Sequence, residues 1–163
     1  MSKPKAKAPG TSRATPSSAE HLSRAATLFV SDSCLCLHVH RAARALARRF
    51  DDLLRPLGLT NGQFSLLMSL NRPEPPSLGS VASLLAVDRT TLTANLKPLE
   101  RRGLLTIAID SKDRRSRQLT LTAEGRALLV KAYPVWEQAH AVIEQQLAGV
   151  KAEDMRVALR SLH

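Results

Sequence analysis

The sequence contains few of the residues that mark several common classes of protein. Of its 163 residues, two are cysteines and five are aromatic, and no run of about 18 apolar residues is present to span a bilayer. Two cysteines provide no disulfide framework, which fits a reducing compartment. Five aromatic side chains make a poor stacking platform for bases, which disfavours RNA binding. Without an apolar leader segment, we expect a cytoplasmic protein with no membrane partner.

The residue groupings that carry out catalysis are also missing. The sequence has no glycine-rich phosphate loop and no evident set of three or four metal ligands. Cys36 and His40 lie one helical turn apart, and such a pair is able to serve as a nucleophile and its base, but no carboxylate is placed to orient the imidazole. We therefore expect neither an enzyme nor a bound metal or cofactor.

Basic residues outnumber acidic ones, 24 to 14, and the net charge is +10. Residues 1–24 carry five basic side chains and one acidic one, whereas residues 89–118 carry eight and three. The first stretch is rich in Pro, Ser, Ala and Lys and lacks apolar periodicity, so residues 1–25 are interpreted as a flexible basic arm. The remaining residues, 26–163, are sufficient for one domain.

Apolar residues recur at spacings of three and four in four segments, which predicts helices near 31–55, 61–70, 77–85 and 89–101. Pro56 and Gly58 interrupt the first pattern. Thr60 or Asn61 is suited to cap the second helix, and Ser77 to cap the third. On the third helix we expect Leu78, Val81, Leu84 and Leu85 to form the buried side.

The fourth predicted helix, capped by Asp88, has the pattern of a DNA recognition helix. Leu92, Leu96 and Leu99 share one side, and the opposite side carries small, hydroxyl and basic residues that permit close approach to a groove. Pro98 predicts a kink or an early 3₁₀ turn. The candidate DNA contacts of this helix are Arg89, Thr90, Thr91, Thr93, Ala94, Lys97 and Arg101.

A predicted β-hairpin follows directly. Asp110 breaks the apolar run 104–109, and Leu119 and Leu121 restart an alternating pattern. Like charges crowd the intervening loop, which makes physical sense where a polyanion neutralises them. The candidate DNA contacts here are Lys112, Asp113, Arg114, Arg115 and Arg117. The predicted fold is mainly α with a small β-hairpin wing, a winged helix-turn-helix that binds double-stranded DNA.

Two further helices are predicted after the wing, one from Ala123 to about Gln146 with a bend at Pro134, and one over 152–162. Thr122 is the expected cap of the first. With the helix near 31–55, their apolar residues exceed what one small domain buries, so we expect a homodimer that forms through the N- and C-terminal helices. A non-specific architectural DNA-binding protein is the alternative function.

At this point the sequence resembles the MarR family of bacterial transcriptional regulators, over about residues 35–162. The resemblance rests on the segments Leu57-Gly58-Leu59-Thr60 with Gln63 and Phe64, Asp88-Arg89-Thr90-Thr91-Leu92-Thr93 and Leu99-Glu100-Arg101-Arg102-Gly103-Leu104, and on Asp113, Arg115, Leu121, Thr122 and Gly125. It implies one MarR-like domain over 26–163, with dimerisation helices at 31–57 and 123–163 and a winged-helix core at 60–122. It also implies a pseudo-palindromic operator, with Arg115 in the minor groove, and release by a small ligand or by thiol oxidation.

The position of Cys36, 22 residues before Gly58, resembles that of the reactive cysteine in the peroxide-sensing branch of the family. The two tyrosines of that branch are replaced here by His40 and Phe50. A neighbouring imidazolium favours a thiolate, and Cys34 and His38 repeat the spacing. Both cysteines are alternatively small buried hydrophobes, or, less simply, metal ligands.

A small-molecule effector is the other alternative for the switch. The resemblance implies a pocket between the helices near 31–55, 61–70 and 123–146. The candidate residues for binding an anionic aromatic compound there are His40, Arg44 and Trp136.

Overall fold

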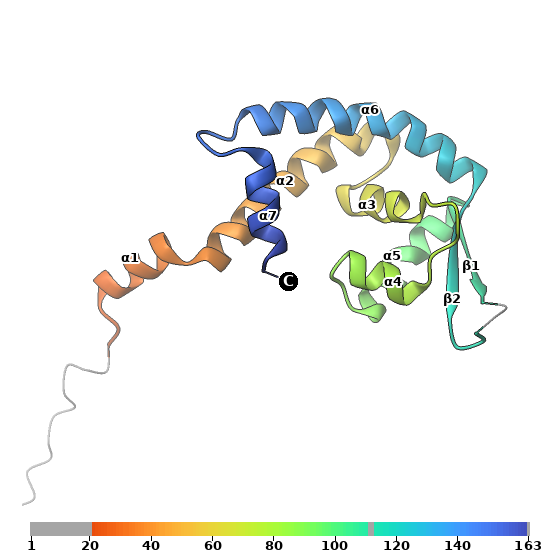
Figure 1. The fold of residues 1–163 in the computed structure, drawn as a ribbon, viewed down its shortest axis with the longest axis horizontal. Coiled ribbons are helices and arrows are strands. Elements are labelled where there is room, and N and C mark those ends of the chain that lie inside the picture. The colour runs from red at the N-terminus through yellow and green to blue at the C-terminus, as the bar shows by residue number, and fades with distance from the viewer. Residues whose placement is uncertain (1–20, 111–112, 163) are drawn as a thin grey trace, which may run out of the picture. The chain divides into compact units, whose positions relative to one another are not determined.

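A computed structural model of the chain describes residues 21–110 and 113–162. The chain divides into two compact units between Ala42 and Ala43. Figure 1 shows the order of the elements along the chain. Most of the predicted arm and Lys112 lie outside the described residues.

The N-terminal unit, up to Ala42, contains helix α1 (Arg24–Ser33) and the first part of α2 (Leu35–Leu54). The prediction of one helix from residue 31 onward is wrong, because Cys34 adopts an extended backbone (φ −73°, ψ 101°) between the two helices. The Sγ atom of Cys34 accepts a hydrogen bond from Leu37 N at 3.4 Å, so the cysteine caps α2. None of the described residues up to Ala42 is buried.

The C-terminal unit begins with the rest of α2, which ends where Pro56 and Gly58 interrupt the helical pattern, as predicted. The short 3₁₀ helix η2 (Arg55–Leu57) follows, and Gly58 takes the left-handed conformation (φ 66°) that closes the turn. Helix α3 (Asn61–Leu70) then starts with a capping box formed by Thr60 and Gln63, which confirms Thr60 as the cap.

Helices α4 (Leu78–Leu84) and α5 (Arg89–Arg101) form the helix-turn-helix. Ser77 caps α4 by accepting a hydrogen bond from Ser80 N, and Asp88 caps α5, both as predicted. The predicted buried side of α4 is confirmed at Val81 but wrong at Leu84, whose side chain is 56% exposed.

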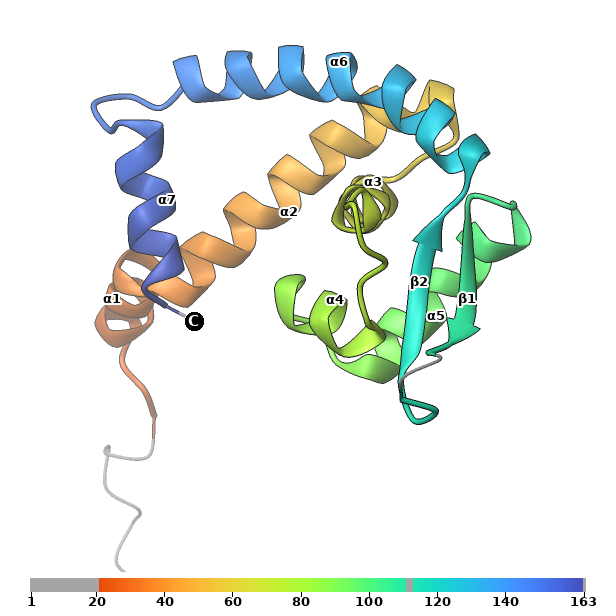
Figure 2. The same ribbon diagram turned by 45° about the vertical axis from the view of Figure 1, so that its right-hand side comes forward.

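The wing consists of β1 (Leu105–Ile109) and β2 (Arg117–Leu121), paired antiparallel with Ile107 opposite Leu119. Leu119 N also donates to the carbonyl of Pro76, so β2 is attached to the segment before α4. The tip of the hairpin points away from α6, as Figure 2 shows. With α4 and α5, this hairpin forms the predicted winged helix.

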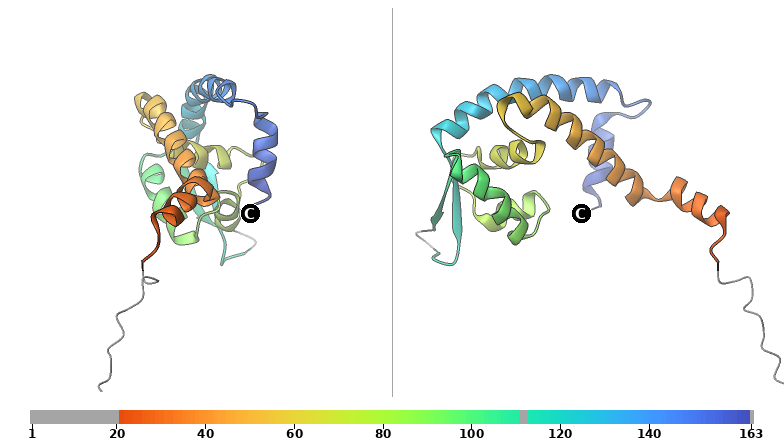
Figure 3. Two further views of the ribbon diagram at one scale, coloured as in Figure 1. Left: turned by 90° about the vertical axis from the view of Figure 1, so that its left-hand side faces the viewer. Right: turned by 180° about the vertical axis from the view of Figure 1, so that it is seen from behind.

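Helices α6 (Ala123–Gln145) and α7 (Ala152–Arg160) complete the C-terminal unit. Thr122 caps α6 as predicted, and α6 continues through Pro134 along a curved path (Figure 3). Arg156 of α7 pairs with Glu144 of α6, which ties the two helices together. Among the described residues, no helix combines the length and apolar character needed to cross a membrane.

The core of the C-terminal unit consists mainly of leucines contributed by short elements. Its largest fully buried side chains come from α2, α3, α4, α5 and the wing: Leu54, Leu67, Val81, Leu92, Leu96, Leu99, Leu105 and Leu119. Because α5 and the wing share this core, their outward faces are held in a fixed relation to each other.

Candidate nucleic-acid interface

The orientation of α5 is fixed by its apolar side. Leu92, Leu96 and Leu99 are fully buried, as predicted. The opposite side, predicted to contact DNA, is exposed throughout: Thr90, Thr93, Ala94, Lys97 and Arg101. A helix of this kind presents a row of small and basic side chains to the major groove of an approaching duplex.

The N-terminus of α5 is organised by Asp88. One carboxylate oxygen accepts a hydrogen bond from Thr91 N at 2.7 Å and the other from the Thr91 hydroxyl at 2.6 Å. The Thr91 hydroxyl bond, followed by the backbone bond, lowers the pKa of Asp88. The Thr91 hydroxyl hydrogen is therefore committed to the cap and is not free to donate to a base or phosphate.

Thr93 and Thr90 differ in the freedom of their hydroxyl groups. The Thr93 hydroxyl donates back to the carbonyl of Arg89 at 2.7 Å, which leaves its oxygen only as an acceptor. Within the described part of the chain, Thr90 makes no side-chain hydrogen bond, so both functions of its hydroxyl remain free. Of the three threonine hydroxyls of α5, that of Thr90 is therefore the one that remains able to donate a hydrogen bond.

Pro98 does not interrupt α5. The helix is α-helical from Arg89 to Arg101, so the expected early 3₁₀ turn at the proline does not form. Pro98 is half-buried and, with Asn95 and Gln63, lines a hollow of about 170 Å³ between α3 and α5.

The tip of the wing is shaped by Asp113. Its Oδ1 accepts a hydrogen bond from Arg115 N at 3.0 Å, and its carbonyl accepts one from Ser116 N at 2.8 Å. These bonds turn the chain so that Arg114 and Arg115 are both exposed. Arg117, expected on the loop, is instead the first residue of β2, opposite Ile109.

A pocket of about 240 Å³ lies between α4, the start of α5 and the wing. Four predicted DNA contacts, Arg89, Asp113, Arg115 and Arg117, lie around it. Ser77, Leu78 and Gly79 also line the pocket and were not identified from the sequence. Ser77 was recognised from the sequence as the cap of α4, but this local signal does not show that the start of α4 lies against the wing.

The cysteines lie in the N-terminal unit. Cys36 is exposed, and its Sγ lies 4.0 Å from Nε2 of His40, so the predicted pair forms. Cys34 is half-buried, and Nε2 of His38 lies 3.1 Å from the carbonyl of Asp32. Cys36 is therefore not a buried hydrophobe. Among the described residues, no three potential ligands gather to hold a metal.

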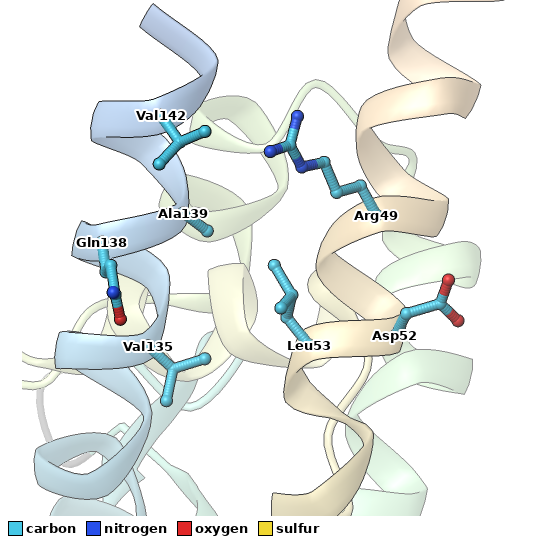
Figure 4. Close-up of a pocket in the computed structure, with 7 residues that line it drawn as sticks. All are labelled: Arg49, Asp52, Leu53, Val135, Gln138, Ala139 and Val142. Atoms are coloured by element: carbon cyan, nitrogen blue, oxygen red, sulfur yellow. The ribbon is translucent and has the colours of Figure 1, made fainter.

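A groove of about 480 Å³ separates α2 from α6, in the region predicted for a ligand (Figure 4). Leu53, Val135, Ala139 and Val142 form its apolar sides, and the groove is also lined by Arg49, Asp52 and Gln138. The predicted ligand residues do not line it: Arg44 is exposed on α2, His40 belongs to the N-terminal unit, and Trp136 stacks between Phe64 and His140.

Comparison with known proteins agrees with this geometry. A profile of the MarR family matches residues 59–116. The HTH-type transcriptional regulator TtmR of Methylorubrum extorquens is 39% identical over 97 residues, which are 60% of this chain and 50% of TtmR. The organic hydroperoxide resistance transcriptional regulator of Bacillus subtilis is 31% identical over 101 residues, which are 62% of this chain and 69% of that regulator.

The fold is shared with a solved structure of a regulator on DNA. The crystal structure of the M. tuberculosis transcriptional regulator MosR in complex with DNA has a TM-score of 0.72 and 36% identity to this chain. The match covers 80% of this chain and 93% of MosR. With this coverage and identity, and with the winged helix in place, the chain belongs to the MarR family.

Proposed function

We propose that the protein is a sequence-specific DNA-binding repressor of transcription with no catalytic role. The observation that carries the proposal is the arrangement of α5, whose leucines are fully buried while its hydroxyl and basic residues face outward beside an arginine-rich wing. In this arrangement α5 enters the major groove, where Thr90, Thr93 and Lys97 contact base edges. Arg114 and Arg115 extend from the wing to the minor groove or its phosphates.

The repressor acts as a homodimer on a pseudo-palindromic operator. Apolar side chains remain exposed on both terminal regions of the described chain, including Phe29 (70% exposed) and Val157 (53%). A second copy is the simplest partner able to cover them. A two-fold dimer also places two recognition helices about 34 Å apart, the length of one turn of DNA.

The proposal is tested by selecting operators from a pool of random duplexes and measuring their affinity by fluorescence anisotropy. The protein should prefer its operator over scrambled duplex by about 10³-fold or more. Lys97→Ala should relax the selected sequence, whereas Arg115→Ala should lower the salt slope by about one for each bound copy. Lys131→Ala, which removes one exposed charge from α6, is the control and should change neither.

Equal affinity for every duplex would contradict the proposal and favour the architectural alternative. That protein would show the salt dependence of phosphate contact without any enrichment during selection. An unchanged salt slope for Arg115→Ala would remove this residue from the DNA interface.

Release from DNA by oxidation of Cys36 is favoured by the contact between this cysteine and His40. Cys36 is exposed beside His40, and a thiolate sulfur there attacks an organic hydroperoxide. The sulfur bonds to the terminal OH of the peroxide as the O–O bond breaks, which gives a sulfenic acid, and the leaving alkoxide takes a proton from water to become the alcohol. Hydroperoxide should release the wild-type protein from its operator but not Cys36→Ser. Equal release of both would shift the search to a small ligand.

The groove between α2 and α6 is the site for that second mechanism. Arg49 lines it, and its Nη1 donates to Oε1 of Gln146 at 2.7 Å, so the guanidinium is already oriented toward α6. An anionic compound with an apolar body fits such a lining. Calorimetry with aromatic carboxylic acids should detect binding that Arg49→Ala weakens, and no heat from any of them would remove this mechanism.

A further inference from the structure

The pocket between α4, α5 and the wing is strongly basic. Arg89 comes from the start of α5, and Arg115 and Arg117 come from the wing. Among the described residues that line the pocket, Asp113 is the one that is acidic. The carboxylate of Asp113 already accepts the backbone N–H of Arg115. The pocket therefore retains an excess of positive charge with little internal compensation.

The three guanidinium groups are available to a ligand. Within residues 21–110 and 113–162, the side chains of Arg89, Arg115 and Arg117 make no hydrogen bond or ion pair. Each guanidinium has donors arranged as a planar fork that matches two oxygens of one phosphate. Arginines from separate elements that converge without partners repel one another, and a bound anion relieves this repulsion.

Arg89 differs from the other basic residues of α5 in its direction. Its Nη2 lies only 3.3 Å from the position that a Cβ on Gly79 would take, so the guanidinium rests on the first turn of α4. A Cβ at residue 79 would therefore crowd the guanidinium and require it to shift slightly. Lys97 and Arg101, in contrast, lie farther along the exposed side of α5 and do not line the pocket.

We infer that this pocket binds one phosphate group of the DNA backbone, held by Arg89 from α5 and by Arg117 from the wing. The inference rests on the proposed function, since it assigns a ligand to part of the same surface. Arg89 is then a positioning residue that fixes the register of α5 in the groove and reads no base. Because one phosphate joins α5 to the wing, binding couples the two DNA-contacting elements.

The test replaces single phosphates of the selected operator with uncharged methylphosphonate linkages, one position at a time. Wild-type protein should lose about 10- to 100-fold in affinity at one linkage in each half-site. Arg89→Ala should lose less than wild type at that linkage, and Arg89→Ala combined with Arg117→Ala should lose almost nothing there, because these changes remove the contacts that the uncharged linkage also removes. Gly79→Ala, whose Cβ crowds Arg89, should show a smaller loss that depends on the same linkage.

Two control variants separate this contact from a general loss of charge. Arg101→Ala lies in the same helix outside the pocket and should keep the full loss at that linkage. Lys131→Ala should behave as wild type at every linkage. Operators with base changes should rank in the same order for Arg89→Ala and wild type, since Arg89 reads no base.

Inorganic phosphate is a second source of the same chemistry. At constant ionic strength, added phosphate should weaken operator binding by the wild type more than by Arg89→Ala. If phosphate competes but no methylphosphonate position matters, the pocket binds a free ion, and the assignment to DNA is overturned.

The failures of the two proposals are distinguishable. If Arg89→Ala and wild type lose the same factor at every linkage while wild type still prefers its operator, the phosphate assignment is wrong and the proposed function stands. If wild type shows no sequence preference, both are wrong.

Discussion

At the scale of single residues, the packing at the base of the wing requires a glycine at position 125. A Cβ on Gly125 would lie 2.1 Å from the carbonyl oxygen of Leu104 and 2.8 Å from Cδ1 of Leu121. The same junction is held by Thr122, whose hydroxyl donates to the carbonyl of Gly103 at 2.7 Å and accepts from Gly125 N at 3.0 Å. The start of α6 therefore touches the turn that leads from α5 into β1.

Gly125→Ala should lower the free energy of unfolding by about 1–3 kcal/mol or more, because backbone atoms must move to admit the methyl group. The measurement is urea denaturation followed by circular dichroism. Gly62→Ala is the matched control, since nothing lies within 4 Å of its added Cβ and the residue is in helix α3. That variant should be about 0.5–1 kcal/mol more stable than wild type. Equal stability of wild type and Gly125→Ala would contradict the tight contact.

Residue roles that depend on near neighbours in sequence could be predicted, and those that depend on distant ones could not. The caps Asp88 and Thr122 act over three residues, so their signal is local and was confirmed. Gly125 was recognised only as part of a family pattern. A side chain at Gly125 is excluded by the carbonyl of Leu104, 21 positions earlier in the sequence. A side chain at Gly79 would crowd the guanidinium of Arg89, which lies across a turn.

At the scale of elements, the sequence patterns predicted every α-helix of the C-terminal unit but neither the 3₁₀ helix η2 nor the break before α2. The spacing of three and four begins at Leu35, after Cys34, and residues 31–55 contain no Gly or Pro, so neither signal marks the break at Cys34. Helix α1 begins at Arg24, within the segment interpreted as an arm, and none of its residues is buried. A helix that buries nothing has no apolar stripe against a core to reveal it.

Helix α7 is attached to α6 by charge more than by burial. None of its residues is buried, whereas Arg156 pairs with Glu144 of α6 and, at 2.9 Å, with Glu153. Arg160 extends the network to Glu153 at 2.8 Å. The hydrogen bond from Arg156 lowers the pKa of Glu144, and that from Arg160, followed by Arg156, lowers the pKa of Glu153.

Arg156→Gln should therefore increase hydrogen exchange in residues 152–160 at pH 7, by a few-fold at most because exposed ion pairs are weak. The carboxylates have lowered pKa values, so their contribution is present above the ordinary value of 4.5 and is lost as pH falls through the folded-state pKa. The difference between variant and wild type should thus shrink in acid and in high salt. Glu137→Gln, which removes a carboxylate bonded to Tyr133 instead, should leave α7 unchanged.

At the scale of the whole molecule, most of the large apolar residues that the described chain leaves exposed lie in helices α1, α2, α6 and α7 rather than in α4, α5 and the wing. Phe29 and Val30 of α1 and Val157 and Leu162 in and after α7 are each more than half exposed. Sequence reasoning anticipated this excess by counting apolar residues, because the count does not depend on where the helices lie. It could not say which side chains stay uncovered, since that follows from packing within one copy.

Val157→Lys should weaken self-association without unfolding the C-terminal unit, because its side chain is 53% exposed and a lysine there costs nothing until a partner covers it. Sedimentation equilibrium at several concentrations measures the change. Ile109→Lys is the control, since Ile109 is 59% exposed on the wing. It should leave the dimer intact.

The salt dependence of operator binding is an independent test of the same dimer interface. A monomer reaches one half-site only, so the salt slope of Val157→Lys at low concentration should fall to about half of the wild-type value. Arg115→Ala instead removes about one unit for each copy while the dimer persists. If Val157→Lys kept both the dimer and the full slope, the partner surface would lie elsewhere, and exposed α1 would become the next segment to test. Only a loss of both together would place α7 at the dimer interface.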